Sequence, residues 1–259
     1  NIKNTITRVG NAVHSDTRPW VVRDNLFITE GMPLNPYKLA DNERYLRDLN
    51  FILDARIKVK PVKGDSVDVY ITTRDVFSLG GSFTPSNATR YRFSLRDNNV
   101  AGWGQGVQFN GLYDYARVPN FGPEFIYTKS SVGGSLINLF AGFTTLNRGS
   151  SYGNENEYAT YVRLDRPLVS PSSRLAGGFE QSRNWSRNNF LLPDSVFRRY
   201  SYNISDVWVG YNIGINNKVK NRDRQFVALR TFQQRFANRP IQTIESLNPV
   251  YNNRQYVLG

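Results

Sequence analysis

Polar and apolar residues alternate from residue 77 to the C-terminal end of this chain. The first run sets Phe77, Leu79 and Phe83 against Ser78, Gly80, Ser82 and Thr84. Because successive side chains of a β-strand point to opposite faces of a sheet, a period of two separates these two sets onto two faces. Residues 76–259 contain nine runs of this kind and the start of a tenth. The sequence therefore predicts a large antiparallel array of strands.

The composition fits either a soluble β-rich protein or a membrane-spanning strand array, since apolar residues make up 39% of the chain. No run approaches the roughly 18 apolar residues that a transmembrane helix needs. Any membrane crossing would therefore use strands, whose lipid-facing half never forms a long apolar run. No basic and apolar signal sequence stands at Asn1, which suggests a processed or truncated chain.

The connections between the predicted strands differ in length. Short turns at 98–104 and 167–173 alternate with longer polar loops at 146–157 and 184–199. Short periplasmic turns and long outer loops are typical of outer-membrane barrels. A β-sandwich would also alternate, but it normally has one buried face per sheet and shorter loops at both ends. The loop pattern therefore favours a barrel over a sandwich.

The first 75 residues predict a separate small domain with the order β-α-α-β-β. Strands are expected at 2–9, 55–60 and 67–71. One helix is expected to have Asp16 or Thr17 as its N-cap and to end before Glu30. A second is expected after Asn35 as the N-cap and Pro36 as the first helical residue. This order alone fits a POTRA domain and an unrelated small α/β domain about equally well.

The second predicted helix carries its own periodic pattern. Its apolar stripe contains Leu39, Leu46 and Leu49, whose spacing places them on one helical face. Its expected water-facing residues are Asp41, Glu43, Arg44 and Arg47. This pattern is typical of a helix with one apolar face and one water-facing side.

Two groups of short motifs resemble a known family. Residues 30–34 (EGMPL) and 44–49 (RYLRDL) are similar to segments of the POTRA domain. Residues 97–106, with Asn99, Gly102 and Gly104, resemble the N-x-x-G-x-G turn early in the barrel of Omp85-type, BamA-like outer-membrane assembly factors. The resemblance implies a periplasmic POTRA-like domain at 1–75 and, at 76–259, the N-terminal part of an outer-membrane β-barrel.

The resemblance also implies a function. Such a protein would insert, assemble or translocate client outer-membrane proteins by templating their strands. Its partners would be unfolded clients, outer-membrane lipid or lipopolysaccharide, and accessory periplasmic or lipoprotein subunits. The alternatives are a two-partner-secretion-type or porin-like channel and, in a third class, a periplasmic binding protein without a membrane span.

Two strand edges are the candidate sites. An unpaired strand exposes N–H and C=O groups to which a client strand can add. Adjacent glycines weaken a strand, which makes the first barrel strand a candidate lateral gate, although they can equally accommodate a bend. The gate candidates are Phe77, Ser78, Leu79, Gly80, Gly81, Ser82 and Phe83. The candidates on the edge of the N-terminal domain are Arg56, Ile57, Lys58, Val59 and Lys60.

The sequence offers no pattern for catalysis, a metal or a cofactor. Its one histidine, His14, finds too few partners for a zinc site or a Ser-His-Asp triad, and there are no cysteines. The net charge of +12 would attract phosphate-rich surfaces, but no nucleic-acid-binding motif or run of five basic residues occurs. We therefore expect neither an enzyme nor a nucleic-acid-binding protein.

Overall fold

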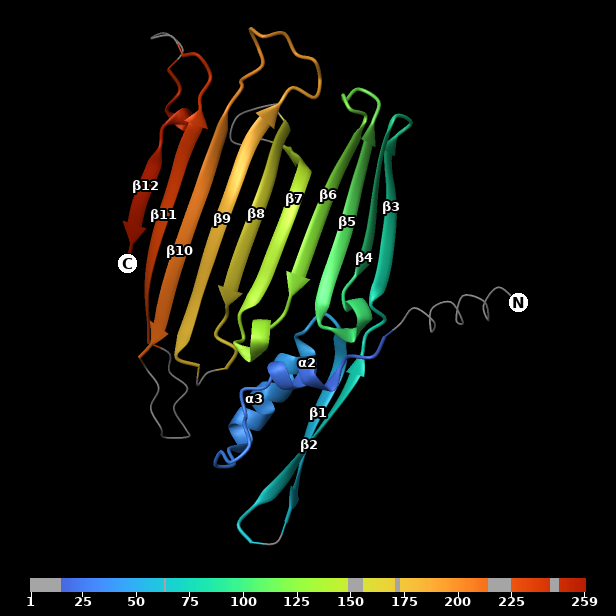
Figure 1. Ribbon diagram of the computed structural model, residues 1–259, viewed down its shortest axis with the longest axis vertical. Coiled ribbons are helices and arrows are strands. Elements are labelled where there is room, and N and C mark those ends of the chain that lie inside the picture. Colours follow the sequence, from blue (N-terminus) through green and yellow to red (C-terminus); the bar gives the residue numbers. More distant parts are fainter. Residues whose placement is uncertain (1–14, 63, 149–155, 171–172, 214–224, 243–246) are drawn as a thin grey trace, which may run out of the picture.

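The computed structural model describes residues 15–62, 64–148, 156–170, 173–213, 225–242 and 247–259. In these residues the chain forms two antiparallel sheets and two α-helices (Figure 1). The helices and the smaller, two-stranded sheet lie beneath one end of the larger sheet. The strand expected at 2–9 and His14 fall outside the described residues.

Helix α3 (Pro36–Arg47) begins where the sequence predicts. The Asn35 side chain accepts hydrogen bonds from the backbone amides of Tyr37 (3.0 Å) and Lys38 (3.3 Å), and Pro36 is the first helical residue. These bonds satisfy donors that the first helical turn leaves unpaired. The prediction of this helix start is confirmed.

Helix α2 (Pro19–Asp24) differs from its prediction at both ends. Its N-cap is Arg18, without a side-chain cap, and it ends well before Glu30. Asn42 of α3 explains the early end, because its side chain accepts from the Phe27 amide (3.0 Å) and donates to the Asn25 carbonyl (3.1 Å). The backbone after α2 is thus bonded to α3 and does not continue the helix.

The same asparagine shifts the buried stripe of α3. Leu46 and Leu49 are buried as predicted, whereas Leu39 is only half-buried. Asp41 was expected to face water but is buried, one helical turn before the buried Tyr45. The stripe of α3 therefore centres on Asn42, Tyr45 and Leu46, since α3 must present Asn42 to the chain that follows α2, and Leu49 lies just past the helix end.

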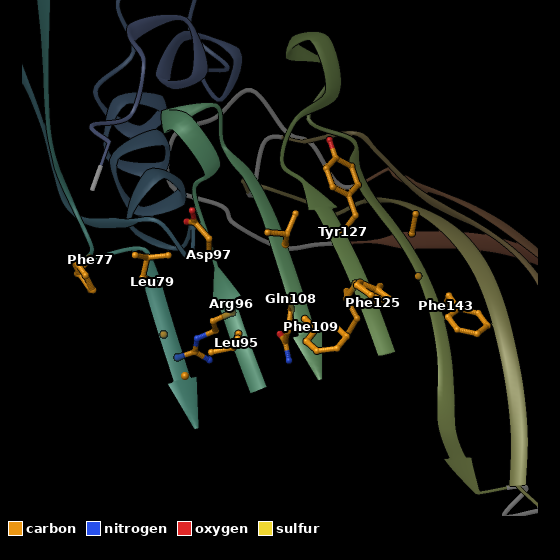
Figure 2. A pocket seen from close by; sticks show the side chains of 16 residues that line it. Phe77, Leu79, Leu95, Arg96, Asp97, Gln108, Phe109, Phe125, Tyr127 and Phe143 are labelled. Carbon is orange, nitrogen blue, oxygen red and sulfur yellow. The ribbon is translucent and has the colours of Figure 1, made fainter. Parts of the chain in front are cut away.

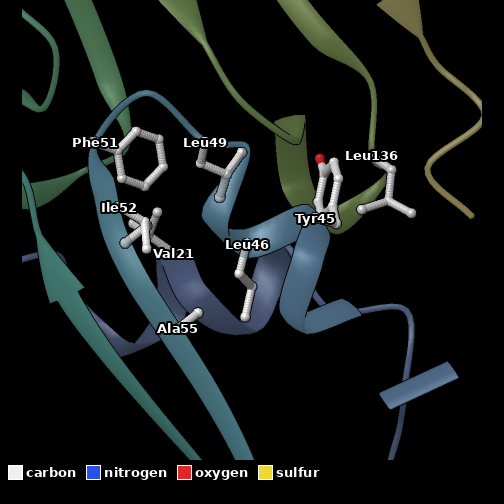
Figure 3. Packing of buried hydrophobic residues seen from close by; sticks show 8 residues of the cluster. All are labelled: Val21, Tyr45, Leu46, Leu49, Phe51, Ile52, Ala55 and Leu136. Carbon is white, nitrogen blue, oxygen red and sulfur yellow. The ribbon is translucent and has the colours of Figure 1, made fainter. Parts of the chain in front are cut away.

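A compact apolar cluster holds this N-terminal unit together (Figure 3). Its buried members are Val21, Tyr45, Leu46, Leu49, Phe51, Ile52, Ala55 and Leu136. Leu136 comes from a connection of the large sheet, so the core includes a residue from outside the first 75. Strands β1 (Ile52–Pro61) and β2 (Val67–Asp75) pair next to this core, and their hairpin extends away from it (Figure 1).

The large sheet contains ten antiparallel strands, and each strand pairs with the next one along the chain. The strands are β3 (Leu79–Asn87), β4 (Arg90–Asp97), β5 (Gln105–Asp114), β6 (Phe121–Lys129), β7 (Asn138–Arg148), β8 (Asn156–Arg166), β9 (Leu175–Arg187), β10 (Ser201–Asn212), β11 (Phe226–Asn238) and β12 (Arg254–Leu258). Over the described residues the sheet is not closed, because β3 and β12 each have one partner. The predicted strand array is confirmed; the predicted POTRA identity of the N-terminal unit stays a prediction.

Two expectations about the connections are wrong. The predicted loop at 184–199 begins only after Arg187, because Ser182, Asn184 and Ser186 continue β9 with buried polar side chains. The expected difference in loop length is also absent from the early hairpins. The shortest connection, 88–89, lies at the end away from the N-terminal unit, whereas 98–104 and 130–137 lie next to it. These longer turns contact the N-terminal unit, which is why they are not minimal.

Candidate functional site

Large apolar side chains share one face of the ten-stranded sheet. The strand register places Leu95 beside Phe109 and Phe109 beside Phe125, and farther along it places Val209 beside Leu229. We call this set the apolar belt; its members, exposed or half-buried, are Leu79, Leu95, Val107, Phe109, Phe125, Tyr127, Ala141, Phe143, Val162, Leu164, Phe179, Val207, Val209, Leu229 and Val257. Phe125 is 54% exposed and Val209 is 53% exposed. The belt therefore has no cover within the described chain.

A groove of about 1170 Å³ lies over β3 to β7 and is lined mainly by belt side chains (Figure 2). Phe109 and Phe125 pack there with ring centroids 4.8 Å apart. The small residues Gly81 and Ala141 also contribute to the lining. Apolar rings and small residues suit an apolar occupant.

The opposite face of the sheet is charged. The register places Arg230 beside Trp208 and Asp206 beside Glu180 on this face, and the Arg230 Nε donates to the Asp206 carboxylate at 2.8 Å. The guanidinium of Arg163 lies 4.4 Å from the ring centroid of Phe140. The charged members are Arg92, Arg96, Glu124, Arg163, Asp165, Glu180, Asp206 and Arg230. One apolar and one charged face is the arrangement by which a barrel faces lipid outside and water inside.

Strand β3 forms one free edge of the described sheet and contains most of the gate candidates. Phe77 and Ser78 precede the strand, and Ser78 is only 2% exposed. Leu79, Gly80, Gly81, Ser82 and Phe83 lie in the strand. A Cβ on Gly80 would lie 2.8 Å from the Arg96 Nε, so a neighbouring side chain fills the space at this glycine. The glycines therefore allow β4 side chains to cover β3, and the gate role stays a prediction.

The edge of β1 is partly occupied. The Ile57 amide donates to the Glu43 carboxylate at 2.8 Å, on the side away from β2. Since amides of an antiparallel strand alternate between its two edges, Val59 points the same way and Lys58 points into the ladder with β2. Pro61 follows and has no amide to offer. Of the candidates Arg56, Ile57, Lys58, Val59 and Lys60, only Val59 would present a free donor at this edge of the described chain.

The turn at 98–104 fixes the N-terminal unit against the sheet. The Asn99 side chain accepts from the Gly104 amide (2.8 Å) and donates to the Thr17 hydroxyl (2.8 Å). The Arg18 amide donates to the Gly102 carbonyl (2.9 Å). A Cβ at Gly102 would lie 2.1 Å from the Asp16 carbonyl oxygen, and Gly102 also has a positive φ of 74°. The glycine is therefore required by the close approach of the two backbones.

At the other end of the sheet, Arg117 joins several connections. It is fully buried, and its Nη2 donates to the Thr145 carbonyl (3.1 Å) and to the Tyr158 hydroxyl (2.9 Å). The Tyr158 hydroxyl in turn donates to the Asn189 side chain (2.9 Å). Burial lowers the pKa of Arg117. Sequence reasoning missed this residue, because nothing near position 117 distinguishes it among 33 lysines and arginines.

A second polar cluster lies near Arg117. The Glu157 carboxylate accepts from the hydroxyls of Tyr200 (3.1 Å) and Tyr202 (3.0 Å). Tyr251 packs against Tyr200 with ring centroids 5.9 Å apart. The connections at this end of the sheet therefore fold against one another and bury part of the charged face.

None of the helices that the structure describes is long and apolar enough to cross a membrane. The same residues contain no cluster of three or more acidic, histidine or cysteine side chains that could hold a metal ion.

Sequence comparisons identify no relative: no protein-family profile matches the chain, and no curated protein matches it. Among solved structures, the chain is similar to "The crystal structure of BamA from Haemophilus ducreyi lacking POTRA domains 1-3", with a TM-score of 0.42 and 14% sequence identity. The similarity covers 85% of this chain and 48% of that chain, so this chain spans about half the length of that structure.

Proposed function

We propose that this chain is part of an outer-membrane β-barrel protein of the Omp85 type, which inserts, assembles or translocates client outer-membrane proteins by strand templating. Its N-terminal unit would lie in the periplasm. Its partners would be unfolded clients, outer-membrane lipid or lipopolysaccharide, and accessory periplasmic or lipoprotein subunits. The proposal requires neither catalysis nor a cofactor.

The apolar belt is the observation that carries this proposal. Burying apolar surface is worth about 25 cal/mol per Å², and soluble monomers rarely expose contiguous apolar patches larger than a few hundred Å². A belt that extends from Leu79 in β3 to Val257 in β12 needs an apolar cover. Lipid supplies that cover. The charged face, which contains the Arg230–Asp206 pair, remains exposed to water.

The open edge of β3 supports strand templating. The backbone groups of β3 that point away from β4 have no partner strand in the described chain. Ser82 and Phe83 are exposed on this strand. Pro85 also lies in this strand, in keeping with the preference of proline for edge strands. A client strand could extend the sheet here through backbone hydrogen bonds.

The runner-up is a two-partner-secretion-type or porin-like channel. A wide pore would leave the charged face accessible, whereas Ser182 and Asn184 on that face are buried. The Val118 amide also donates to the Asn189 carbonyl (2.6 Å), which ties two connections together at this end. A stable, large conductance of the full-length protein in a planar bilayer would favour the channel.

Cysteine crosslinking tests the templating role in the full-length protein, whose described chain lacks native cysteines. Ser82→Cys on β3 is the test variant. Ser94→Cys is its control, since Ser94 lies directly opposite Ser82 but on β4, between two partner strands. We expect a stalled client to crosslink to the cysteine at 82 and not to the one at 94. Crosslinks from position 82 that reach only the protein's own last strand, whichever client is supplied, would contradict the proposal.

Proline substitutions separate folding from client capture at β1. Lys58→Pro removes an amide directed into the β1–β2 ladder and should cost about 3 kcal/mol or more. Val59→Pro removes the one amide that would be free at the outer edge, so the domain should stay folded while client capture weakens. Unchanged capture by a folded Val59→Pro variant would remove this edge from the client-binding site.

A further inference from the structure

A small basic pocket lies between the N-terminal unit and the connection from β8 to β9. Its volume is about 190 Å³, and its lining includes Lys38 of α3, Arg166 at the end of β8 and Arg174 before β9. The lining contains no aspartate or glutamate. Within the described residues, none of the three cations forms an ion pair. Three like charges around one cavity repel each other, and an anion in the cavity would relieve that repulsion.

The pocket is amphipathic. Phe27 and Leu175 contribute apolar surface, and Ser170 and Ser173 contribute polar surface to the lining. The Ser173 amide donates to the Ser170 carbonyl (3.0 Å), and the Asn212 amide donates to the Arg174 carbonyl (2.8 Å). These bonds hold the backbone at Ser173 and Arg174, two residues of the pocket lining.

The position of the pocket relative to the apolar belt indicates its ligand. Arg166 lies two residues after Leu164 on β8, and Leu175 lies four residues before Phe179 on β9, so both share the face of the belt. The pocket thus adjoins the belt at the end of the sheet nearest the N-terminal unit. Arginine and lysine at such a border keep their charged groups near lipid head groups while their stems contact apolar surface.

We infer that this pocket binds the phosphate of a membrane phospholipid whose acyl chains lie on the apolar belt. Arginine suits phosphate because its planar fork can donate two parallel hydrogen bonds, and lysine adds a point charge. The cavity, about 190 Å³, is below the roughly 300–1000 Å³ of sites that enclose a drug-sized ligand, so it fits a head group and not a whole lipid. The inference rests on the proposed function, since it assigns the belt to lipid.

Binding of a short-chain lipid tests the pocket. The full-length protein in detergent micelles would be titrated with dihexanoyl phosphatidylglycerol and with dihexanoylglycerol, which lacks the phosphate. The test variant combines Lys38→Gln, Arg166→Gln and Arg174→Gln. The control variant combines Arg183→Gln, Arg199→Gln and Arg235→Gln; it removes the same charge from exposed positions outside the pocket.

We expect the wild type and the control variant to bind phosphatidylglycerol and to discriminate against the phosphate-free lipid. The test variant should bind it about tenfold or more weakly, because it loses charge-assisted hydrogen bonds. Equal weakening in both variants would reduce the effect to net charge and overturn the inference. Equal affinity for the phosphate-free lipid would also overturn it, as would displacement by inorganic phosphate at concentrations equal to those of the lipid.

Two controls keep the result interpretable. If the triple variant fails to fold, the pair Lys38→Gln and Arg174→Gln leaves β8 unchanged and makes the same prediction with a smaller loss. Carbonate extraction of membranes tests the proposed function separately. Release of the wild-type protein by carbonate would contradict the membrane-spanning role, whereas loss of the phosphate preference alone would contradict only the lipid pocket.

Discussion

The N-terminal unit and the ten-stranded sheet place their apolar residues in opposite ways. In the first, Val21, Leu46 and Phe51 are buried in a shared core. In the second, Leu95, Phe125 and Val209 lie exposed on one face. Both regions contain strands with similar alternation, so alternation tells which side chains share a face but not which solvent that face meets. Water stabilises the first arrangement, and an apolar environment is needed for the second.

The largest effect expected from this contrast is at Phe51. Phe51→Ala should destabilise the N-terminal unit by about 3–5 kcal/mol, because it opens a cavity in a packed core. Phe125→Ala on the belt should cost much less in detergent micelles, where mobile chains fill the space. Urea unfolding of fluorotryptophan-labelled protein, followed at the Trp20 signal, measures the loss of stability caused by Phe51→Ala in the N-terminal unit. Similar losses for both variants would mean that the belt is a packed protein core.

A charge on the belt gives the next largest effect. Leu229→Arg should cost about 2–4 kcal/mol in a bilayer if this position lies near the midplane. Ala228→Arg is the matched control, since Ala228 precedes it on β11 and faces the charged side. Denaturant titrations of folding in lipid vesicles measure the free energy of folding of both variants relative to the wild type. An equal cost for the two variants would show that lipid does not distinguish the two faces.

The buried tyrosine of the N-terminal unit predicts a pH effect. Burial raises the pKa of Tyr45 from 10.0 to about 12. Above pH 10 the unfolded chain releases this proton while the folded chain retains it, so stability falls as pH rises from about 10 to about 12. The total loss should be about 2–3 kcal/mol. The stability of Tyr45→Phe, measured from the Trp20 signal during urea unfolding, should not show this loss between about pH 10 and about pH 12. An identical pH profile for wild type and variant would contradict the prediction.

The smallest expected effect is at the cap of α3. Asn35→Ala should cost about 1 kcal/mol, because the amides of Tyr37 and Lys38 lose their acceptor. Asn35→Asp should restore most of that stability, as both residues are good N-caps. For Asn35→Ala, the urea concentration at which the Trp20 signal reports unfolding should fall, while the unfolding midpoint of the sheet should stay the same. A matching shift in the sheet would show that the two regions unfold together.

Local rules predicted the elements whose causes are local. Asn35 and Pro36 define the start of α3, and alternation predicted the large antiparallel strand array after residue 76. Long-range contacts decided the rest. Asn42 ends α2 from another helix, and Ser182 and Asn184 continue β9 because they pair with both β8 and β10. No pattern of neighbouring residues carries that information.

The candidate sites follow the same division. Alternation and the adjacent glycines indicated β3, but Arg96 over Gly80 appears only when the register is known. At β1 the sequence indicated an exposed edge, while Glu43 binds the Ile57 amide from a helix 14 residues away in sequence. The basic pocket escaped notice because Lys38 and Arg174 are far apart along the chain.

Leu136 has a consequence for the order of folding. This residue completes the core around Val21 and Leu46, yet it follows four strands of the large sheet. The first core is therefore complete only when the connection between β6 and β7 packs against the N-terminal unit. Until then the N-terminal unit has an apolar gap in its core, so its stability depends on the sheet that follows it in the chain.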